Sequence, residues 1–323
     1  MSALLCPFPA VQPRRRQLLT PAGLQACAGV PEESGKLRLF EVGCGGAAAF
    51  LSGHIPGAGY LDTKAMERPP LWNKVDDASL LRLLLENGIS SASCVVLYGR
   101  DGGGTLAAAR AAHLLLYAGV ADVRLLDGGL AAWRGAGLPL LRGAAPAHAP
   151  APAFGASFPA RPDYLIDTAG AKALLAQENG VLASIRSRAE FMGLTSGYGY
   201  IAASGDIPGA RWGRAGADGD VNSMSDYQQA DGTMKPAAAI LRFWRRAGIG
   251  PQRRTAFYCG TGWRASLAFF YAWSMGWDDI CVYDGGWYEW SADPANPLAR
   301  AGLCTAASSC PAQQQLPAAA AGI

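Results

Sequence analysis

The feature that most constrains the fold of this chain is an internal duplication. Three landmarks occur twice in the same order: "GHIPGA" (53–58) and "GDIPGA" (205–210), "CVVLYGRDGGG" (94–104) and "RTAFYCGTGW" (254–263), and "VRLLDGGLAAW" (123–133) and "ICVYDGGWYEW" (280–290). The offsets are 152, 160 and 157 residues, whereas solenoid repeats have periods of about 20–50 residues. The 323-residue chain is therefore predicted to contain two copies of one domain.

Each copy alternates short apolar runs with helical patterns. In the first copy, "KLRLFEV", "CVVLY" and "DVRLL" predict strands, and "DASLLRLLLENGI" and "TLAAARAAHLLLYAG" predict helices, the former with Asp77 as N-cap. The second copy repeats this order with "GVLASI", "AAAILRFWRRAGI", "TAFY", "RASLAFFYAWSMG" and "ICVY". Such alternation indicates an α/β fold in which each domain is a parallel sheet flanked by helices.

The remaining segments set the domain boundaries. A helix start at Thr20-Pro21 places the beginning of the first domain near residue 18, so 1–17 is an N-terminal extension and 18–140 the first domain. An Ala/Pro-rich linker, expected to be extended and stiff, covers 141–162. The second domain covers 163–292. The tail 293–323 is of low complexity, and we expect it to be disordered.

Composition excludes several classes of function. Half of the residues are hydrophobic and the net charge is only +3, so a packed core is expected and nucleic acid is not an expected partner. No apolar run approaches the roughly 20 residues that span a bilayer. With three histidines and no CxxC pair, neither a metal site nor a cofactor is expected. The cysteine usage favours a reducing, cytoplasmic location, with organellar import or export as the alternatives.

Cys259 has the most distinctive surroundings of the eight cysteines. It leaves a predicted buried strand and enters a glycine-rich turn that leads into a predicted helix. Glycines let backbone N–H groups converge on an anion, and the helix adds its positive end. Such a field, together with a nearby arginine, lowers the pKa of a cysteine thiol from about 8.5 to roughly 3.5–7.5. We predict that Cys259 is a nucleophile; the alternative is a buried structural cysteine.

Further residues are expected to contact the substrate. Arg186 follows a strand end in "LASIRSRAEF" and should point to the same sheet edge as Cys259. Arg188 and Glu190 are expected to form a local surface pair. The predicted substrate-binding residues are Arg186, Gly260, Thr261, Gly262, Trp263 and Arg264.

The first copy lacks the nucleophile. Where the second copy has Tyr258-Cys259, the first has Tyr98-Gly99, followed by Arg100. The first copy is therefore predicted to be catalytically silent, serving stability and walling the cleft of the second. Cys44 and Cys94 have no Gly/Arg cradle, and we interpret both as structural.

Together these motifs resemble the rhodanese superfamily over nearly all of 18–292. The residues that carry the resemblance are "GHIPGA", "LLDGGLAAW", "SIRSRAEF", "GDIPGARW", "YCGTGWRAS" and "VYDGGWYEW". The loop is most similar to that of bacterial multi-module thiosulfate sulfurtransferases with "CGTGWR". Compared with that group, the chain is expected to lack a first module and an export signal.

The resemblance implies a ping-pong thiosulfate sulfurtransferase. The Cys259 thiolate would attack the outer sulfur of thiosulfate, sulfite would leave, and the persulfide would be handed to cyanide, a thiol or a partner protein. Arg186 and Arg264 would steady the sulfonate end of this small-molecule donor.

Departures from the family pattern leave the donor open. The Gly260-Thr261 pair resembles the loop of 3-mercaptopyruvate sulfurtransferases, but the Asp–His pair of those enzymes is incomplete, since only Asp62 has a match. A phosphatase or arsenate reductase of this fold uses a Cys-x5-Arg loop, whereas four residues separate Cys259 from Arg264 here. A non-catalytic binding module would have lost the nucleophile in both copies.

Overall fold

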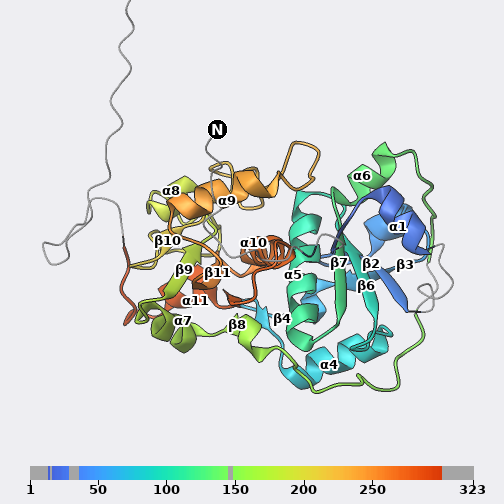
Figure 1. The fold of residues 1–323 in the computed structure, drawn as a ribbon, viewed down its shortest axis with the longest axis horizontal. Helices are drawn as coiled ribbons and strands as arrows, with labels where there is room; N and C mark the ends of the chain where they lie inside the picture. Colours follow the sequence, from blue (N-terminus) through green and yellow to red (C-terminus); the bar gives the residue numbers. More distant parts are fainter. Residues whose placement is uncertain (1–13, 15–16, 29–35, 145–147, 300–323) are drawn as a thin grey trace, which may run out of the picture.

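The computed structural model describes residue 14 and residues 17–28, 36–144 and 148–299 of the chain. It contains two five-stranded sheets in which every pairing is parallel, and each sheet has helices on both faces (Figure 1). The predicted α/β class and its tandem organisation are confirmed. The strands of one sheet lie between residues 18 and 126, and those of the other between 165 and 283.

The first sheet has the strand order β1-β7-β6-β2-β3. Its strands are β1 (Leu18–Leu19), β2 (Leu37–Gly43), β3 (Ala58–Asp62), β6 (Cys94–Tyr98) and β7 (Asp122–Leu126). The accompanying helices are α1 (Pro21–Ala28), α3 (Ala48–Ser52), α4 (Asp77–Glu86), α5 (Gly102–Ala118), α6 (Gly129–Gly135) and the 3₁₀ turn η2 (Thr63–Ala65).

The second sheet has the equivalent order β10-β9-β11-β12-β8. Its strands are β8 (Leu165–Ile166), β9 (Gly180–Ser184), β10 (Arg211–Trp212), β11 (Arg254–Tyr258) and β12 (Ile280–Tyr283). The helices are η3 (Pro162–Tyr164), α7 (Thr168–Leu175), α8 (Arg188–Phe191), α9 (Ala237–Arg246), α10 (Trp263–Ser274) and α11 (Gly286–Ala292).

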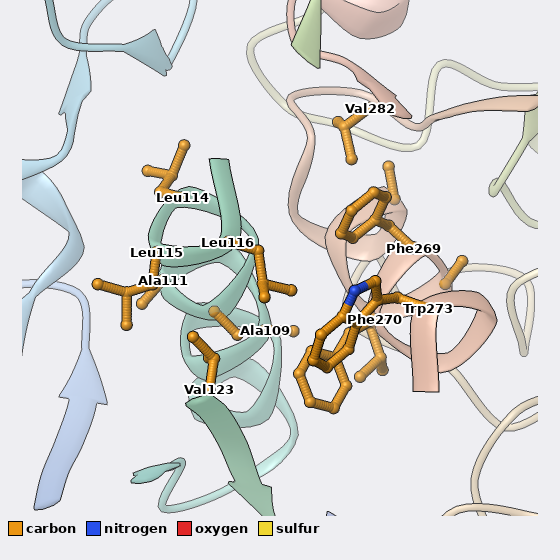
Figure 2. Close-up of a cluster of buried hydrophobic side chains, with 14 of the residues drawn as sticks. Ala109, Ala111, Leu114, Leu115, Leu116, Val123, Phe269, Phe270, Trp273 and Val282 are labelled. Carbon is orange, nitrogen blue, oxygen red and sulfur yellow. The ribbon is translucent and has the colours of Figure 1, made fainter. Parts of the chain in front are cut away.

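Helices α5 and α10 form a layer between the two sheets (Figure 1). Figure 2 shows Leu116 of α5 facing Phe269 and Trp273 of α10. These side chains belong to one continuous apolar cluster that takes residues from both domains. Because burying apolar surface is the main force that holds such an interface, the two domains are packed as one body.

Alternation along the strands decides which side chains face this central layer. In β11, Phe257 and the following Cys259 belong to the central cluster, whereas Ala256 and Tyr258 pack against α7 and α11 on the outer face. Side chains of successive strand residues point to opposite faces of a sheet. Cys259 is thereby directed towards the first domain.

A small antiparallel hairpin connects the first domain to the site. It consists of β4 (Glu67–Arg68) and β5 (Asn73–Lys74), outside both large sheets. The side chain of Asn73 donates to Glu289 at 2.6 Å, and the backbone N–H of Lys74 donates to Asp284 at 2.7 Å. Both acceptors belong to the second domain, so the hairpin is fastened across the interface.

Two local expectations, the cap of α4 and the disorder of the tail, differ from the structure, and the linker makes contacts that the sequence did not predict. The N-cap of α4 is Asp76, not Asp77, since its carboxylate accepts from the N–H of Ser79 at 2.8 Å. The linker has no helix or regular strand in its described part before η3, but it is packed on the first domain, with Phe154 buried in the central cluster. Disorder of the tail is wrong for 293–299, because Ala299 forms a two-bond backbone bridge with Asp206. Residues 300–323 lie outside the described residues.

Candidate active site

Cys259 is the first residue after β11 and is 1% exposed. It nevertheless lines a cavity of about 620 Å³, a space that can hold a small molecule, and its thiol interacts electrostatically with Tyr198 and Tyr200 of the same lining. The other buried cysteine of the described residues, Cys281, does not line that cavity, and burial raises the pKa of its thiol to about 12. Burial alone therefore does not distinguish the two cysteines; the cavity and the loop do.

The loop after Cys259 leads into α10 without a side-chain cap. Gly262 is the N-cap residue at φ +92°, a left-handed conformation that glycine adopts without strain, and no side chain of the described residues caps this helix. The first backbone N–H groups of a helix have no partner within it, and the helix end carries partial positive charge. The turn beside Cys259 is consequently suited to an anion.

Arg264 in the first turn of α10 is held by the second domain. Its two terminal nitrogens, Nη1 and Nη2, each donate to a Glu190 carboxylate oxygen at 2.8 Å. Nη2 also donates to the Tyr198 hydroxyl at 2.6 Å, and the same hydroxyl accepts the N–H of Gly260 at 3.0 Å. Arg264 thus fastens both ends of the Cys259 loop, while its Nε has no partner among the described residues.

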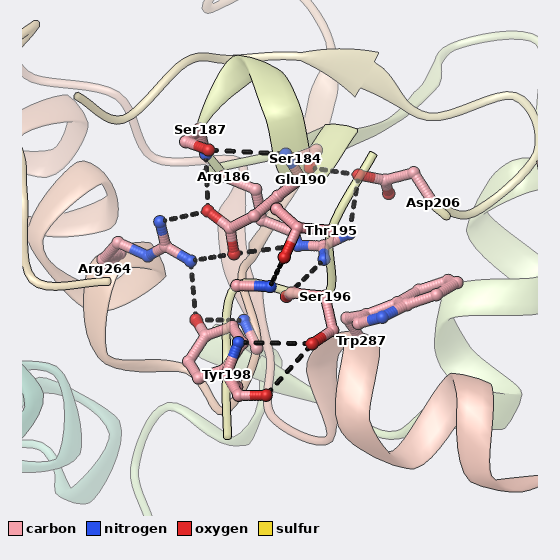
Figure 3. A network of polar contacts seen from close by, with 12 residues as sticks. Ser184, Arg186, Ser187, Glu190, Thr195, Ser196, Tyr198, Asp206, Arg264 and Trp287 are labelled. Carbon is pink, nitrogen blue, oxygen red and sulfur yellow. Dashed lines mark hydrogen bonds and ion pairs between the residues drawn. The ribbon is translucent and has the colours of Figure 1, made fainter. Parts of the chain in front are cut away.

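Glu190 corrects an expectation. It does not form a surface pair with Arg188; it is buried between Arg264 and Arg186 (Figure 3). Its carboxylate also completes a capping box with Ser187 at the start of α8. Burial raises the pKa of Glu190, but the hydrogen bonds and charge of Arg264, the charge of Arg186 and the N–H of Ser187 together outweigh burial, and the net pKa lies below its ordinary value. The residue is ionised and ties two arginines together.

Arg186 lies behind the loop and does not line the cavity. Its guanidinium is fully buried, and Nη1 donates to the carbonyl of Gly205 at 2.6 Å and to Asp206 at 3.1 Å. Nη2 donates to the carbonyl of Ser196 at 3.0 Å. The sequence suggested that Arg186 steadies the substrate directly. Its partners instead give it a supporting position under the segment that carries Tyr198.

The cavity is walled by both domains and is rich in aromatic residues. The first domain contributes Cys44, Pro69, Pro70, Trp72 and Leu106, and the second contributes Gly197, Tyr198, Gly199, Tyr200, Val221, Asn222, Cys259, Thr261, Trp263, Arg264 and Tyr288. Among these residues Arg264 alone carries a formal charge. The first domain therefore walls the cleft, as expected, whereas Cys44, interpreted as structural, is exposed and lines the same cavity.

Trp72 is in an unusual conformation. Its φ is 62°, in the left-handed region that large side chains rarely adopt, and its N–H donates to the carbonyl of Arg68 at 2.8 Å. The turn of the β4–β5 hairpin thereby presents an indole to the cavity. Strained residues persist where the surroundings fix them, which is common at ligand-binding sites.

Sequence reasoning found the loop but missed Glu190, Tyr198, Tyr200 and the hairpin. A weak signal for the tyrosines exists in "TSGYGYI", where two aromatic residues lie among glycines. Nothing in the local sequence of Glu190 or Trp72 indicates which distant element each will contact.

Comparison with known proteins defines the protein family to which this site belongs. The model of the rhodanese-like domain matches residues 33–136 and 167–293, and the chain belongs to this family of sulfurtransferases. It is similar to thiosulfate sulfurtransferase YnjE of Escherichia coli K12, at 50% identity over 266 residues, which are 82% of this chain and 60% of that protein. A probable 3-mercaptopyruvate sulfurtransferase of Pseudomonas aeruginosa is 34% identical, with 79% of this chain and 87% of that protein covered.

Two kinds of solved structure are also similar. The crystal structure of YnjE has a TM-score of 0.84 at 47% identity, covering 88% of this chain and 68% of that chain. An anaerobic ergothioneine biosynthesis enzyme from Chlorobium limicola, solved in complex with its natural substrate trimethyl histidine, has a TM-score of 0.83 at 39% identity, covering 91% and 72%. No helix among the described residues is long and apolar enough to cross a membrane.

Proposed function

We propose that the protein moves sulfane sulfur from thiosulfate to a thiophilic acceptor through a persulfide on Cys259. The observation that carries this proposal is the position of Cys259, on the wall of a cavity and beside the uncapped start of α10. A thiolate and a persulfide anion are both stabilised by such a helix end.

In the first half-reaction, the Cys259 thiolate attacks the outer sulfur of thiosulfate. A new S–S bond forms at Cys259, the S–S bond of thiosulfate breaks, and sulfite leaves with the electron pair. The N–H groups of Thr261, Gly262 and Trp263 are assigned to the anionic sulfur. The unpartnered Nε–H of Arg264 is assigned to an oxygen of the donor, whereas Arg186 supports the loop through Glu190.

In the second half-reaction, a nucleophilic acceptor attacks the terminal sulfur of the persulfide and Cys259 leaves as thiolate. Cyanide, a small thiol or a protein thiol each satisfies this chemistry. The cavity of about 620 Å³ is far larger than thiosulfate needs, which favours an organic acceptor over cyanide. We propose the cytoplasm as the compartment, where free thiols persist; cell fractionation tests this assignment.

Mass spectrometry tests the proposal. The protein is incubated with thiosulfate or, separately, with 3-mercaptopyruvate, and the Cys259 peptide is examined for one added sulfur atom. We expect the adduct with thiosulfate; an adduct with 3-mercaptopyruvate alone would assign the alternative donor. Cys27→Ser, which changes a cysteine remote from the cavity lining, is the control and should keep the adduct. An absent adduct with both donors, together with phosphate release from an aryl phosphate, would replace the proposal with a phosphatase.

A second candidate is transfer of sulfur to an aromatic betaine. Its support is the wall formed by Trp72, Trp263, Tyr200 and Tyr288, because aromatic faces attract quaternary ammonium groups. The Chlorobium limicola enzyme is described with trimethyl histidine as natural substrate. Incubating the persulfidated protein with trimethyl histidine and measuring its sulfur-containing product tests this candidate; unchanged trimethyl histidine would exclude it.

A further inference from the structure

Arg110 of α5 is a fully buried arginine that belongs to the silent domain. Its Nε donates to the carboxylate of Glu67, in the hairpin, at 2.8 Å. Its Nη2 donates to Asp284, which follows β12 in the second domain, at 2.5 Å. The guanidinium therefore bridges the two domains.

The third nitrogen of Arg110 points to the active loop. Nη1 is buried and has no hydrogen-bond partner among the described residues. A Cβ atom placed on Gly262 would lie 3.2 Å from this nitrogen, so Nη1 lies against the N-cap residue of α10. A buried, unpaired N–H is unfavourable unless something is gained by its placement.

Both carboxylates that hold Arg110 are connected to the same loop. The indole N–H of Trp263 donates to the Glu67 oxygens at 3.0 and 2.9 Å. Asp284 precedes the turn whose Gly286 approaches the carbonyl of Cys259, and the N–H of Trp287 donates to that carbonyl at 2.7 Å. Arg110 is thus linked to the Cys259 loop on both sides.

Charge gives this arrangement a chemical consequence. Without the guanidinium, Asp284 and the ionised form of Glu67 would place uncompensated negative charge beside a loop that has to hold a thiolate. Like charges oppose ionisation of a nearby acid. Among the described residues, the ionisable groups around the loop and its cavity are Arg264, Glu190, Tyr198, Tyr200, Tyr288, Cys44, Arg186, Glu67, Asp284 and Arg110.

We propose that Arg110 is a positioning residue through which the silent domain keeps the Cys259 loop in place and balances the negative charge of Glu67 and Asp284 beside its sulfur. Arg110 does not touch the substrate, because it does not line the cavity. The inference deepens the proposed function, since it takes Cys259 to be the nucleophile. It explains why a domain without a nucleophile has a buried arginine directed at the loop of its twin.

The test is the pH dependence of Cys259 alkylation by iodoacetamide, followed by mass spectrometry of the Cys259 peptide in the full chain. In Arg110→Met the midpoint should rise by about one pH unit, which slows alkylation about tenfold below the midpoint. Arg110→Lys keeps the charge and should recover most of the rate. Arg100→Met breaks the partly buried Arg100–Glu41 pair of the silent loop and should leave the midpoint unchanged.

A second variant protects the test against loss of folding. Glu67→Gln removes the negative charge that Glu67 carries when ionised and should move the midpoint downwards, opposite to Arg110→Met. An unchanged midpoint in folded Arg110→Met, or equal shifts in Arg110→Met and Arg100→Met, would overturn the inference. If Arg110→Met does not fold, an unchanged Glu67→Gln midpoint overturns it alone. Alkylation needs no sulfur donor, so a wild-type protein without a sulfur adduct would defeat the proposed function and leave this result intact.

Discussion

The starts of α5 and α10 occupy equivalent places in the two domains and differ first in the group that meets the N-terminal end of the helix. In the silent domain the carboxylate of Asp101 accepts the N–H of Gly104 at 2.7 Å, so the chain supplies its own anion. In the second domain Gly262 stands at the N-cap and offers no side chain. The comparison shows that the loop of the second domain can accept an anion because no side chain caps the N-terminus of its helix.

The silent loop is also closed to a nucleophile by packing. Gly99 matches Cys259, since each carbonyl accepts an N–H from the start of the following α6 or α11 helix. A Cβ on Gly99 would lie 2.1 Å from a backbone carbon of Gly104. Arg100 meanwhile makes a two-bond pair with Glu41 at 2.9 Å. Loss of the cysteine is therefore accompanied by loss of the space it needs.

The largest expected effect comes from replacing Cys259 with glycine, the residue that the silent loop has at the equivalent position, Gly99. Cys259→Gly should fold and lose sulfur transfer by about a thousandfold or more, because no thiolate remains to carry the sulfur. The transfer rate with thiosulfate and cyanide measures the loss. A residual rate within tenfold of wild type would mean that another thiol carries the sulfur.

A side chain added at Gly99 tests whether the silent loop has space for one. Gly99→Ala should lower the free energy of unfolding by about 3 kcal/mol, because the new methyl group meets backbone atoms that cannot move aside. Urea unfolding of the purified variant measures the change. Transfer activity of the folded fraction should stay close to wild type, and a stability equal to wild type would refute the claim that the silent loop is closed.

Protonation of Glu67, at the contact between the two domains, makes the stability of the protein depend on pH. Burial, the largest influence, raises the pKa of Glu67 to about 7 against the lowering effect of Arg110 and Trp263. Because the folded pKa exceeds the unfolded value, the protonated carboxyl favours the folded state, and this contribution is lost as pH rises from about 4.5 to about 7. Wild type should therefore lose about 3 kcal/mol relative to Glu67→Gln over that range. Parallel stability curves for the two proteins would contradict the assignment.

Removing one hydroxyl from each domain sharpens the comparison further. Tyr198→Phe deletes the acceptor shared by Arg264 and Gly260 and should lower the transfer rate about tenfold, since the loop loses its fastening. Tyr98→Phe deletes the acceptor of the Ile55 N–H in the silent domain and should change stability only. Equal loss of transfer in the two variants would show that the effect is general.

The smallest expected effect concerns acceptor choice. Trp72→Ala should raise the KM for a bulky thiol acceptor about fivefold, roughly 1 kcal/mol of lost contact, and leave the KM for cyanide unchanged. Steady-state kinetics with both acceptors measure the difference. An equal rise for both acceptors would place Trp72 outside acceptor recognition.

Sequence patterns predicted the features that depend on neighbouring residues. The period of apolar residues defines β11 and α10, and the glycines around Cys259 define the turn between them, so the fold and the reactive loop were accessible. The cap of α4 was missed by one residue because Asp76 and Asp77 are chemically alike, and only the backbone geometry selects between them.

Features that depend on tertiary contacts were not accessible. Glu190 resembles a surface residue in its short helix, and its burial follows from Arg264, more than seventy positions away in sequence. The same holds for Arg110, which in sequence is one polar residue in an alanine-rich helix. The direction of Arg186 depends on Asp206 and on the carbonyls it contacts.

The shared layer of α5 and α10 has a consequence for synthesis on the ribosome. The face of α5 that packs on α10 is complete at Ala118, but its partner ends at Ser274. At about 5–20 residues per second, the intervening 156 residues (274 − 118) take roughly 10–30 s to be translated. During that interval the nascent first domain presents an apolar surface with no partner, which makes the chain a candidate for chaperone capture before its second half emerges.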